Sequence, residues 1–141
     1  MGIELLRKVM RGVATAGFTL AGLDHFWNAA FFDKIVPPMF PDPHLMVVIS
    51  GVAEIAGGIG LQVPRLRRAA GWGLIALLIA VFPANVYMAV APKDNPASAF
   101  PKWALWARLP LQAVFIAWVW WVMRPRVGSD SSDWLFSSIA R

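Results

Sequence analysis

The chain has 141 residues, of which 58% are hydrophobic and only 15% are charged, with a mean hydropathy of +0.58. A soluble domain carries about a quarter of charged residues, so this composition excludes an ordinary soluble protein and indicates an integral membrane protein. The absence of cysteine excludes disulfides and thiolate metal sites, and no metal centre is expected.

The first predicted span covers about residues 9–31. It follows a basic start, and aromatic residues extend its apolar run, with Asp24 and His25 in the last two turns. A basic start before an apolar run also occurs in signal peptides, but no small-residue cleavage pattern follows here. Small residues four positions apart, as at Gly12 and Ala16, predict that another helix approaches closely at this point.

The second predicted span, residues 45–63, is the most distinctive stretch. Its 19 residues would extend about 28 Å as a helix, close to the ~30 Å hydrocarbon core of a bilayer. Its one charge, Glu54, lies in the middle, where a charge costs about 3 kcal/mol and is expected to face a partner or a wet cavity. Gly57 and Gly60 mark a closely packed face. The preceding residues 32–44 contain four prolines and predict a stiff loop whose apolar centre dips into the headgroup layer.

The third predicted span covers about residues 69–90. Pro83 lies inside it and removes one backbone hydrogen bond, so the carbonyl of Ile79 loses its donor and the helix is expected to bend. Asn85 follows just beyond the bend. A polar loop containing prolines then leads to the last span.

The fourth predicted span covers about residues 103–123, with tryptophans near both ends, as is typical of membrane interfaces. It contains Arg108, Pro110 and Gln112. The membrane domain is therefore expected to occupy residues 1–127, and residues 128–141 form a polar C-terminal tail that could dock on a partner.

The loop charges predict the orientation of these spans. Nine basic residues fall on one side of the predicted membrane: Arg7, Lys8, Arg11, Arg65, Arg67, Arg68, Arg124, Arg126 and Arg141. Three fall on the other: Lys34, Lys93 and Lys102. The positive-inside rule then places both termini in the cytoplasm, as an even number of spans requires. This topology accounts for the net charge of +5, so no nucleic-acid partner is expected.

Six polar residues from the four spans fall at similar depths, in the outer half or at the midplane of the membrane. They are Asp24, His25, Glu54, Asn85, Arg108 and Gln112. The simplest arrangement is an all-α four-helix bundle with one polar pocket, open to the outer face and closed below by apolar packing. Glu54 and Arg108 are expected to form an ion pair there, with Asp24 as the competing partner.

A structural role must be weighed against a functional one for each of these residues. Asn85 or Gln112 alone more often fixes helix packing, and a single His25 is more often a helix-end residue than a ligand. The ionisable set of Asp24, Glu54 and Arg108 favours a functional site, because such groups are costly inside a bilayer and usually mark pathways or binding sites.

Several blocks of sequence, taken in order, resemble the DoxX-like membrane proteins. The blocks are GLDHF at 22–26, SGVAEIAGGIGL at 50–61, PRLRRAAGWGL at 64–74, FPANVYMA at 82–89 and RLPLQ at 108–112. The resemblance implies a four-span bundle in a bacterial cytoplasmic (inner) membrane, and a link to quinol oxidation or thiosulfate:quinone oxidoreduction. The chain has no cysteine and no soluble partner domain, so catalytic activity does not transfer with the resemblance.

Two functional hypotheses follow. In the first, the chain is a small subunit or accessory protein of a quinone-linked electron-transfer assembly, in which the pocket binds a quinone and the chain itself carries no cofactor. In the second, it is a non-catalytic structural subunit, packed in the lipid bilayer against a larger membrane protein or another copy of itself. A proton-coupled carrier is a weaker third hypothesis, because the inner halves of the spans are almost purely apolar.

Overall fold

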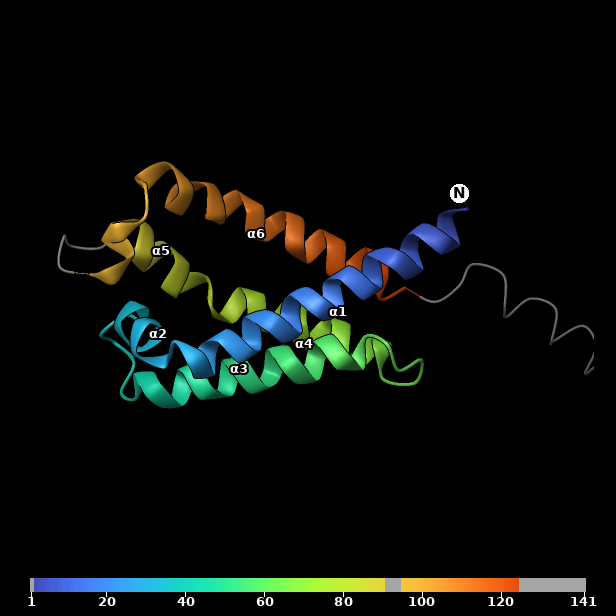
Figure 1. Ribbon diagram of the computed structural model, residues 1–141, viewed down its shortest axis with the longest axis horizontal. Helices are drawn as coiled ribbons and strands as arrows, with labels where there is room; N and C mark the ends of the chain where they lie inside the picture. The colour runs from blue at the N-terminus through green and yellow to red at the C-terminus, as the bar shows by residue number, and fades with distance from the viewer. Residues whose placement is uncertain (1, 91–94, 125–141) are drawn as a thin grey trace, which may run out of the picture.

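The computed structural model describes residues 2–90 and 95–124, which contain helices and no strands. The helices are α1 (Ile3–Trp27), α2 (Ala29–Ile35), α3 (Pro43–Gly60), α4 (Arg67–Ala80), α5 (Phe82–Val90), the short 3-10 helix η1 (Pro96–Ala99) and α6 (Lys102–Val122). The long helices run side by side along one axis (Figure 1). The prediction of an all-helical chain is confirmed, and the tail at 128–141 lies outside the described residues.

Three helical segments are long and apolar enough to cross a membrane, namely Pro43–Gly60, Arg67–Val90 and Lys102–Val122. Their bounds lie within three residues of the predicted second, third and fourth spans. Helix α1 is not among them; it carries charged residues in its first turns and Asp24 and His25 in its last. Large apolar side chains point outward along the other helices, as at Ile49, Ile79 and Val114. Such a surface suits lipid and would be unfavourable in water.

Helices α1 and α3 make the most extensive contact in the molecule and run antiparallel. A Cβ atom added at Gly22 would lie 2.6 Å from the carbonyl oxygen of Gly51, closer than any real contact. Further along, the Thr15 hydroxyl donates to the carbonyl of Gly58 at 2.8 Å. Glycine therefore lets the two backbones approach closely, as small residues do in membrane helix pairs.

The close approach predicted at Gly12 and Ala16 was wrong. A Cβ atom added at Gly12 meets nothing within 4 Å, and Ala16 is exposed. The face of α1 that packs on α3 instead carries Thr15 and Gly22, which are seven residues apart and so lie almost in line along the helix. Spacing alone cannot show which of several small-residue faces meets a neighbour.

The opposite face of α3 packs on α4. A Cβ atom at Gly57 would lie 2.6 Å from Cγ of Leu74, and one at Gly60 would lie 2.7 Å from Cβ of Ala70. The predicted close packing at these two glycines is thus confirmed. Helix α3 therefore lies between α1 and α4 and uses a separate pair of glycines for each.

The first predicted span ends earlier than expected. Helix α1 stops at Trp27, where the side chain of Asn28 donates to the carboxylate of Asp24 and its backbone N–H bonds to the carbonyl of the same residue at 2.8 Å. Helix α2 then occupies part of the predicted loop. Ile35, expected near the headgroups, is instead buried, because it packs in a cluster with residues of α5, η1 and α6.

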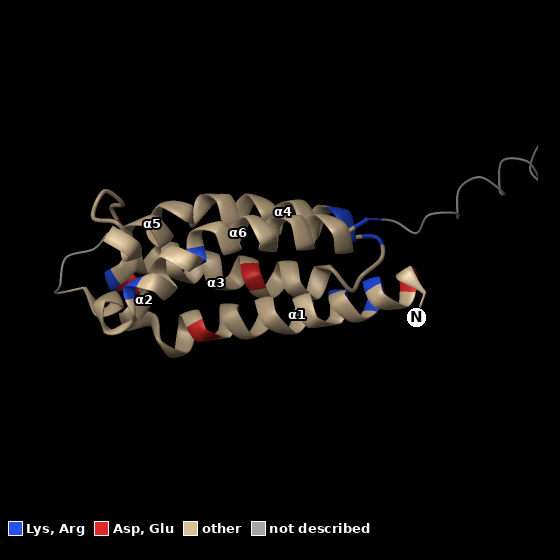
Figure 2. Ribbon diagram, turned by 90° about the horizontal axis from the view of Figure 1, so that it is seen from above, with Lys and Arg blue, Asp and Glu red and all other residues tan. Residues whose placement is uncertain are grey.

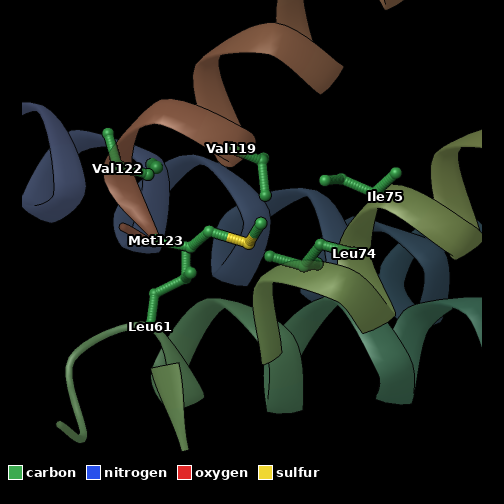
Figure 3. Close-up of a cluster of buried hydrophobic side chains, with 7 residues drawn as sticks. Leu61, Leu74, Ile75, Val119, Val122 and Met123 are labelled. Carbon is green, nitrogen blue, oxygen red and sulfur yellow. The ribbon is translucent and has the colours of Figure 1, made fainter. Parts of the chain in front are cut away.

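Two apolar clusters occupy opposite ends of the fold. One joins α1, α4, α6 and the end of α3, and Figure 3 shows most of its members: Ala14, Leu61, Leu74, Ile75, Val119, Val122 and Met123. The other lies beside α2: Ile35, Met88, Ala97 and Leu105. Lys and Arg positions gather near the ends of the helices, whereas acidic positions also occur along α1 and α3 (Figure 2).

The bend predicted at Pro83 is confirmed as a one-residue interruption of the helix at Val81. Helix α4 ends at Ala80 and α5 begins at Phe82. Around the break, the backbone N–H of Val81 donates to the Leu77 carbonyl at 2.9 Å, and that of Asn85 donates to the Val81 carbonyl at 3.2 Å. The two short helices together still form one segment long enough to cross a bilayer.

We expect Gly22→Ala to destabilise the protein by about 1–3 kcal/mol, because the added methyl would overlap the Gly51 carbonyl and force α1 and α3 apart. Thermal unfolding in detergent measures the effect. The matched control is Gly12→Ala, which meets open space and should leave stability unchanged or raise it by up to about 1 kcal/mol. Equal effects of the two substitutions would contradict the assignment of the α1–α3 interface.

Candidate functional site

An imidazole and a carboxylate meet between α1 and α3. The Nδ1 atom of His25 lies 3.2 Å from Oε2 of Glu54, and the two side chains are only 14% and 15% exposed. The ring of Phe32, from α2, stacks on the imidazole with centroids 4.1 Å apart. The close packing at Gly51 sets this pair, because a Cβ atom there would lie 3.0 Å from Cβ of His25.

The hydrogen bonds of this pair indicate which nitrogen of His25 carries the hydrogen. Nδ1 lies 2.9 Å from the carbonyl oxygen of Ala21, which can only accept, so Nδ1 is the donor. Oε2 of Glu54, although 3.2 Å from Nδ1, is buried without an aligned hydrogen bond within the described part of the chain. A buried carboxylate oxygen in this state calls for a further donor, such as water or a bound molecule.

Two cavities adjoin the pair. The main cavity has a volume of about 580 Å³ and lies between α1, α3, the α4–α5 break and α6, with mostly apolar walls. The second cavity, of about 490 Å³, lies towards α2 and the start of α6. His25, Glu54 and Arg108 line both cavities. Of the other predicted residues, Asn85 and Gln112 line the main cavity and Asp24 lines the second.

The expected ion pair between Glu54 and Arg108 is not the one that forms. Glu54 pairs with His25, and Arg108 has no ion-pair partner within residues 2–90 and 95–124. The reason is the order of packing: α1 lies against α3, whereas α6 faces Glu54 across the cavities. Arg108 is exposed on α6 and lines both cavities.

Asp24 is not the alternative partner of Arg108 either. Its side chain is exposed near the end of α1, and its carboxylate accepts a hydrogen bond from Asn28. Asp24 and Arg108 nevertheless both line the second cavity. Asp24 therefore adds an acidic side chain to the lining of the second cavity, without an ion pair to a basic residue among those that the structure describes.

Asn85 and Gln112 form hydrogen bonds beside the break between α4 and α5. The Asn85 amide donates to Oε1 of Gln112 at 2.8 Å, and the Gln112 amide in turn donates to the backbone carbonyl of Leu78. This carbonyl lies in the last turn of α4, where the break interrupts the backbone hydrogen bonds. Gln112 is buried, so its side chain replaces a backbone donor in the interior.

Sequence reasoning missed two aromatic residues of the site. Phe32 was placed in a loop, but its ring stacks on His25. Trp118 was counted as an interfacial residue, but it lines the main cavity, and its indole nitrogen is buried without a hydrogen-bond partner in the described part of the chain. No signal in the sequence distinguishes these rings from the many aromatic residues that face lipid.

The described residues contain no group of three or more histidine, cysteine or acidic side chains that could hold a metal ion. The main cavity is lined by one acid, one imidazole and one guanidinium, from Glu54, His25 and Arg108, among mostly apolar residues. Such an arrangement can bind the polar end of an amphipathic molecule and exchange protons with it.

We expect Gln112→Met to destabilise the protein by about 1–3 kcal/mol, because the Leu78 carbonyl and the Asn85 amide would both lose a buried partner. Ala113→Met, at the neighbouring exposed position, creates the same side chain and should have little effect. Unfolding in detergent compares the two variants. An unaltered stability of the Gln112 variant would show that the break does not depend on this side chain.

Comparison with known proteins identified one family. A protein-family model described as a domain of unknown function (DUF8561) matches residues 14–123, which include every helix except the start of α1. The searches of curated proteins and of solved structures found no match. Because the match covers most of the chain, this protein belongs to the DUF8561 family.

Proposed function

We propose that the chain crosses a bacterial inner membrane four times, with both termini in the cytoplasm. The packing of α1 supports a fourth span, because contacts at both Gly22 and Thr15 keep it beside α3, a helix apolar enough to cross. The start of α1 carries basic residues, as does the turn that follows α3. The positive-inside rule then puts these ends on the cytoplasmic side.

We further propose that the protein binds the head of a quinone or quinol, as a small subunit or accessory protein of an electron-transfer assembly. The observation that carries this proposal is the His25–Glu54 pair at the edge of a cavity of about 580 Å³ with mostly apolar walls. This volume lies in the range of small-molecule sites, roughly 300–1,000 Å³. The resemblance of the sequence blocks to DoxX-like proteins supports the same ligand class.

The chemistry of the lining suits a quinone. The guanidinium of Arg108 can donate to a quinone carbonyl, and the apolar walls can hold the isoprenoid chain. Reduction of a quinone takes up two protons, and Glu54 with His25 can supply or receive them. Two electrons must come from a redox partner in the assembly, because the ionisable side chains of the site can exchange protons but not electrons.

The donors available to the ligand are fewer than the sequence indicated. Asn85 and Gln112 bond to each other and to the α4–α5 break, so they form a wall of the cavity and its support. Arg108 remains as the principal donor, because it has no ion-pair partner in the described part of the chain. The proposal therefore depends on three residues: His25, Glu54 and Arg108.

We expect Glu54→Gln and Arg108→Met each to lower the amount of quinone that co-purifies with the protein by about tenfold or more. A hydrogen bond to a charged group contributes roughly 1.5–3 kcal/mol, which corresponds to about this change in affinity. Extraction of ubiquinone and menaquinone from the protein purified in mild detergent measures the effect. Matched controls are Glu4→Gln and Arg65→Met, which make the same changes outside both cavities.

A different result would favour the structural alternative. If both cavity variants accumulate normally and retain as much quinone as the controls, the His25–Glu54 pair serves helix packing. The chain would then be a non-catalytic subunit, and a larger membrane complex found with the wild-type protein on native gels would support that role.

A further inference from the structure

The second cavity differs in character from the main one. It shares six lining residues with the main cavity: Ala21, His25, Phe32, Ile35, Glu54 and Arg108. It alone is also lined by Asp24, Phe31, Phe100, Ala104 and Leu105. Ionisable side chains thus converge on it from α1, α3 and α6, and two of them, Asp24 and Arg108, are exposed on the molecular surface.

These properties indicate water. A cavity of about 490 Å³ is many times larger than the ~30 Å³ that one water molecule occupies in the liquid. Cavities lined by polar groups hold water, whereas purely apolar ones stay dry. Oε2 of Glu54 is buried and lacks an aligned donor within the described residues, and a water in this cavity would supply one.

We propose that the second cavity is a hydrated passage that connects the aqueous phase to Glu54 from the side of Asp24 and Arg108. Water and protons then reach the His25–Glu54 pair without passing through the main cavity. His25 and Glu54 line both cavities, so the pair lies where the two cavities adjoin. This inference does not depend on the identity of the ligand, and it holds even if no quinone binds.

Two small residues allow the two cavities to be filled separately, and a third provides a control. Ala104 lines only the second cavity, and Gly17 lines only the main cavity, where an added Cβ atom meets nothing within 4 Å. Ala107 lies on the same helix as Ala104 but is exposed and lines neither cavity. Ala104→Phe should therefore close the passage, and Ala107→Phe is its matched control.

The test uses the full chain in lipid nanodiscs and two carbodiimides. A water-soluble carbodiimide with glycine ethyl ester converts an accessible carboxyl group to an amide, which mass spectrometry detects on the peptide containing Glu54. We expect the wild-type protein and Ala107→Phe to be labelled, and Ala104→Phe to be labelled at least tenfold less. Asp24, which is exposed, reports in the same samples that the reagent is active.

Dicyclohexylcarbodiimide, which partitions into lipid, gives the complementary result. Its labelling of Glu54 should fall at least tenfold in Gly17→Leu and should persist in Ala104→Phe, since it enters through the main cavity. Persistence in Ala104→Phe also shows that this variant is folded. If Ala104→Phe does not accumulate, Ala104→Met narrows the same passage with a more flexible side chain.

Two outcomes would overturn the proposal. One is that the water-soluble reagent leaves Glu54 unlabelled in the wild-type protein while it labels Asp24. The other is that its labelling of Glu54 survives both substitutions at Ala104 but falls in Gly17→Leu, which would make the main cavity the route for water. Loss of quinone binding without a change in labelling would concern the proposed function alone.

Discussion

The contact between α1 and α3 is the constraint on which the rest of the structure depends. At Gly22 and Gly51 the two backbones are too close for any side chain between them. This approach fixes both the separation and the rotation of the helices, and it places His25 beside Glu54. A buried carboxylate would otherwise need a charged partner from across the cavities, so the glycines determine the chemistry of the site although they take no part in it.

Small residues have two opposite effects in this fold. Between α1 and α3 they remove side chains so that the backbones approach closely, whereas on the face of α1 towards the main cavity Gly17 and Ala21 leave space that no described neighbour fills. The two apolar clusters pack the helices together near the ends of the fold. The fold is therefore closely packed near its two ends and leaves the main cavity between them.

Much of the helical architecture could be predicted from the sequence, because hydropathy and proline act locally. The second, third and fourth spans and the break near Pro83 follow from apolar runs and from one missing backbone donor. The early end of the first span was missed, since it depends on the non-helical backbone of Asn28 (φ −115°, ψ 33°), which no proline or glycine marks in the sequence. Helix α2 was missed for a similar reason, because its stability comes from tertiary packing around Ile35.

The candidate site was predicted less well than the helices. Depth in the membrane follows from counting residues, and all six polar residues do line a cavity. Which of these side chains contact one another depends on how each helix is rotated about its axis, and the number of residues along a span does not give this rotation. Glu54 therefore paired with His25 and not with Arg108, and Gln112 turned to the backbone of α4. The stacking of Phe32 on His25 required a helix that the sequence did not indicate.

The hydrogen bond from Gln112 to the Leu78 carbonyl links two positions that are far apart in the chain. The Leu78 carbonyl lies at the helix break beside Pro83, and a side chain on another helix donates to it. Restoring an unbroken helix would leave the amide without its acceptor, and replacing the amide would leave the broken helix without its donor. Evolution should therefore change the two positions together, so that each constrains the substitutions that the other can accept.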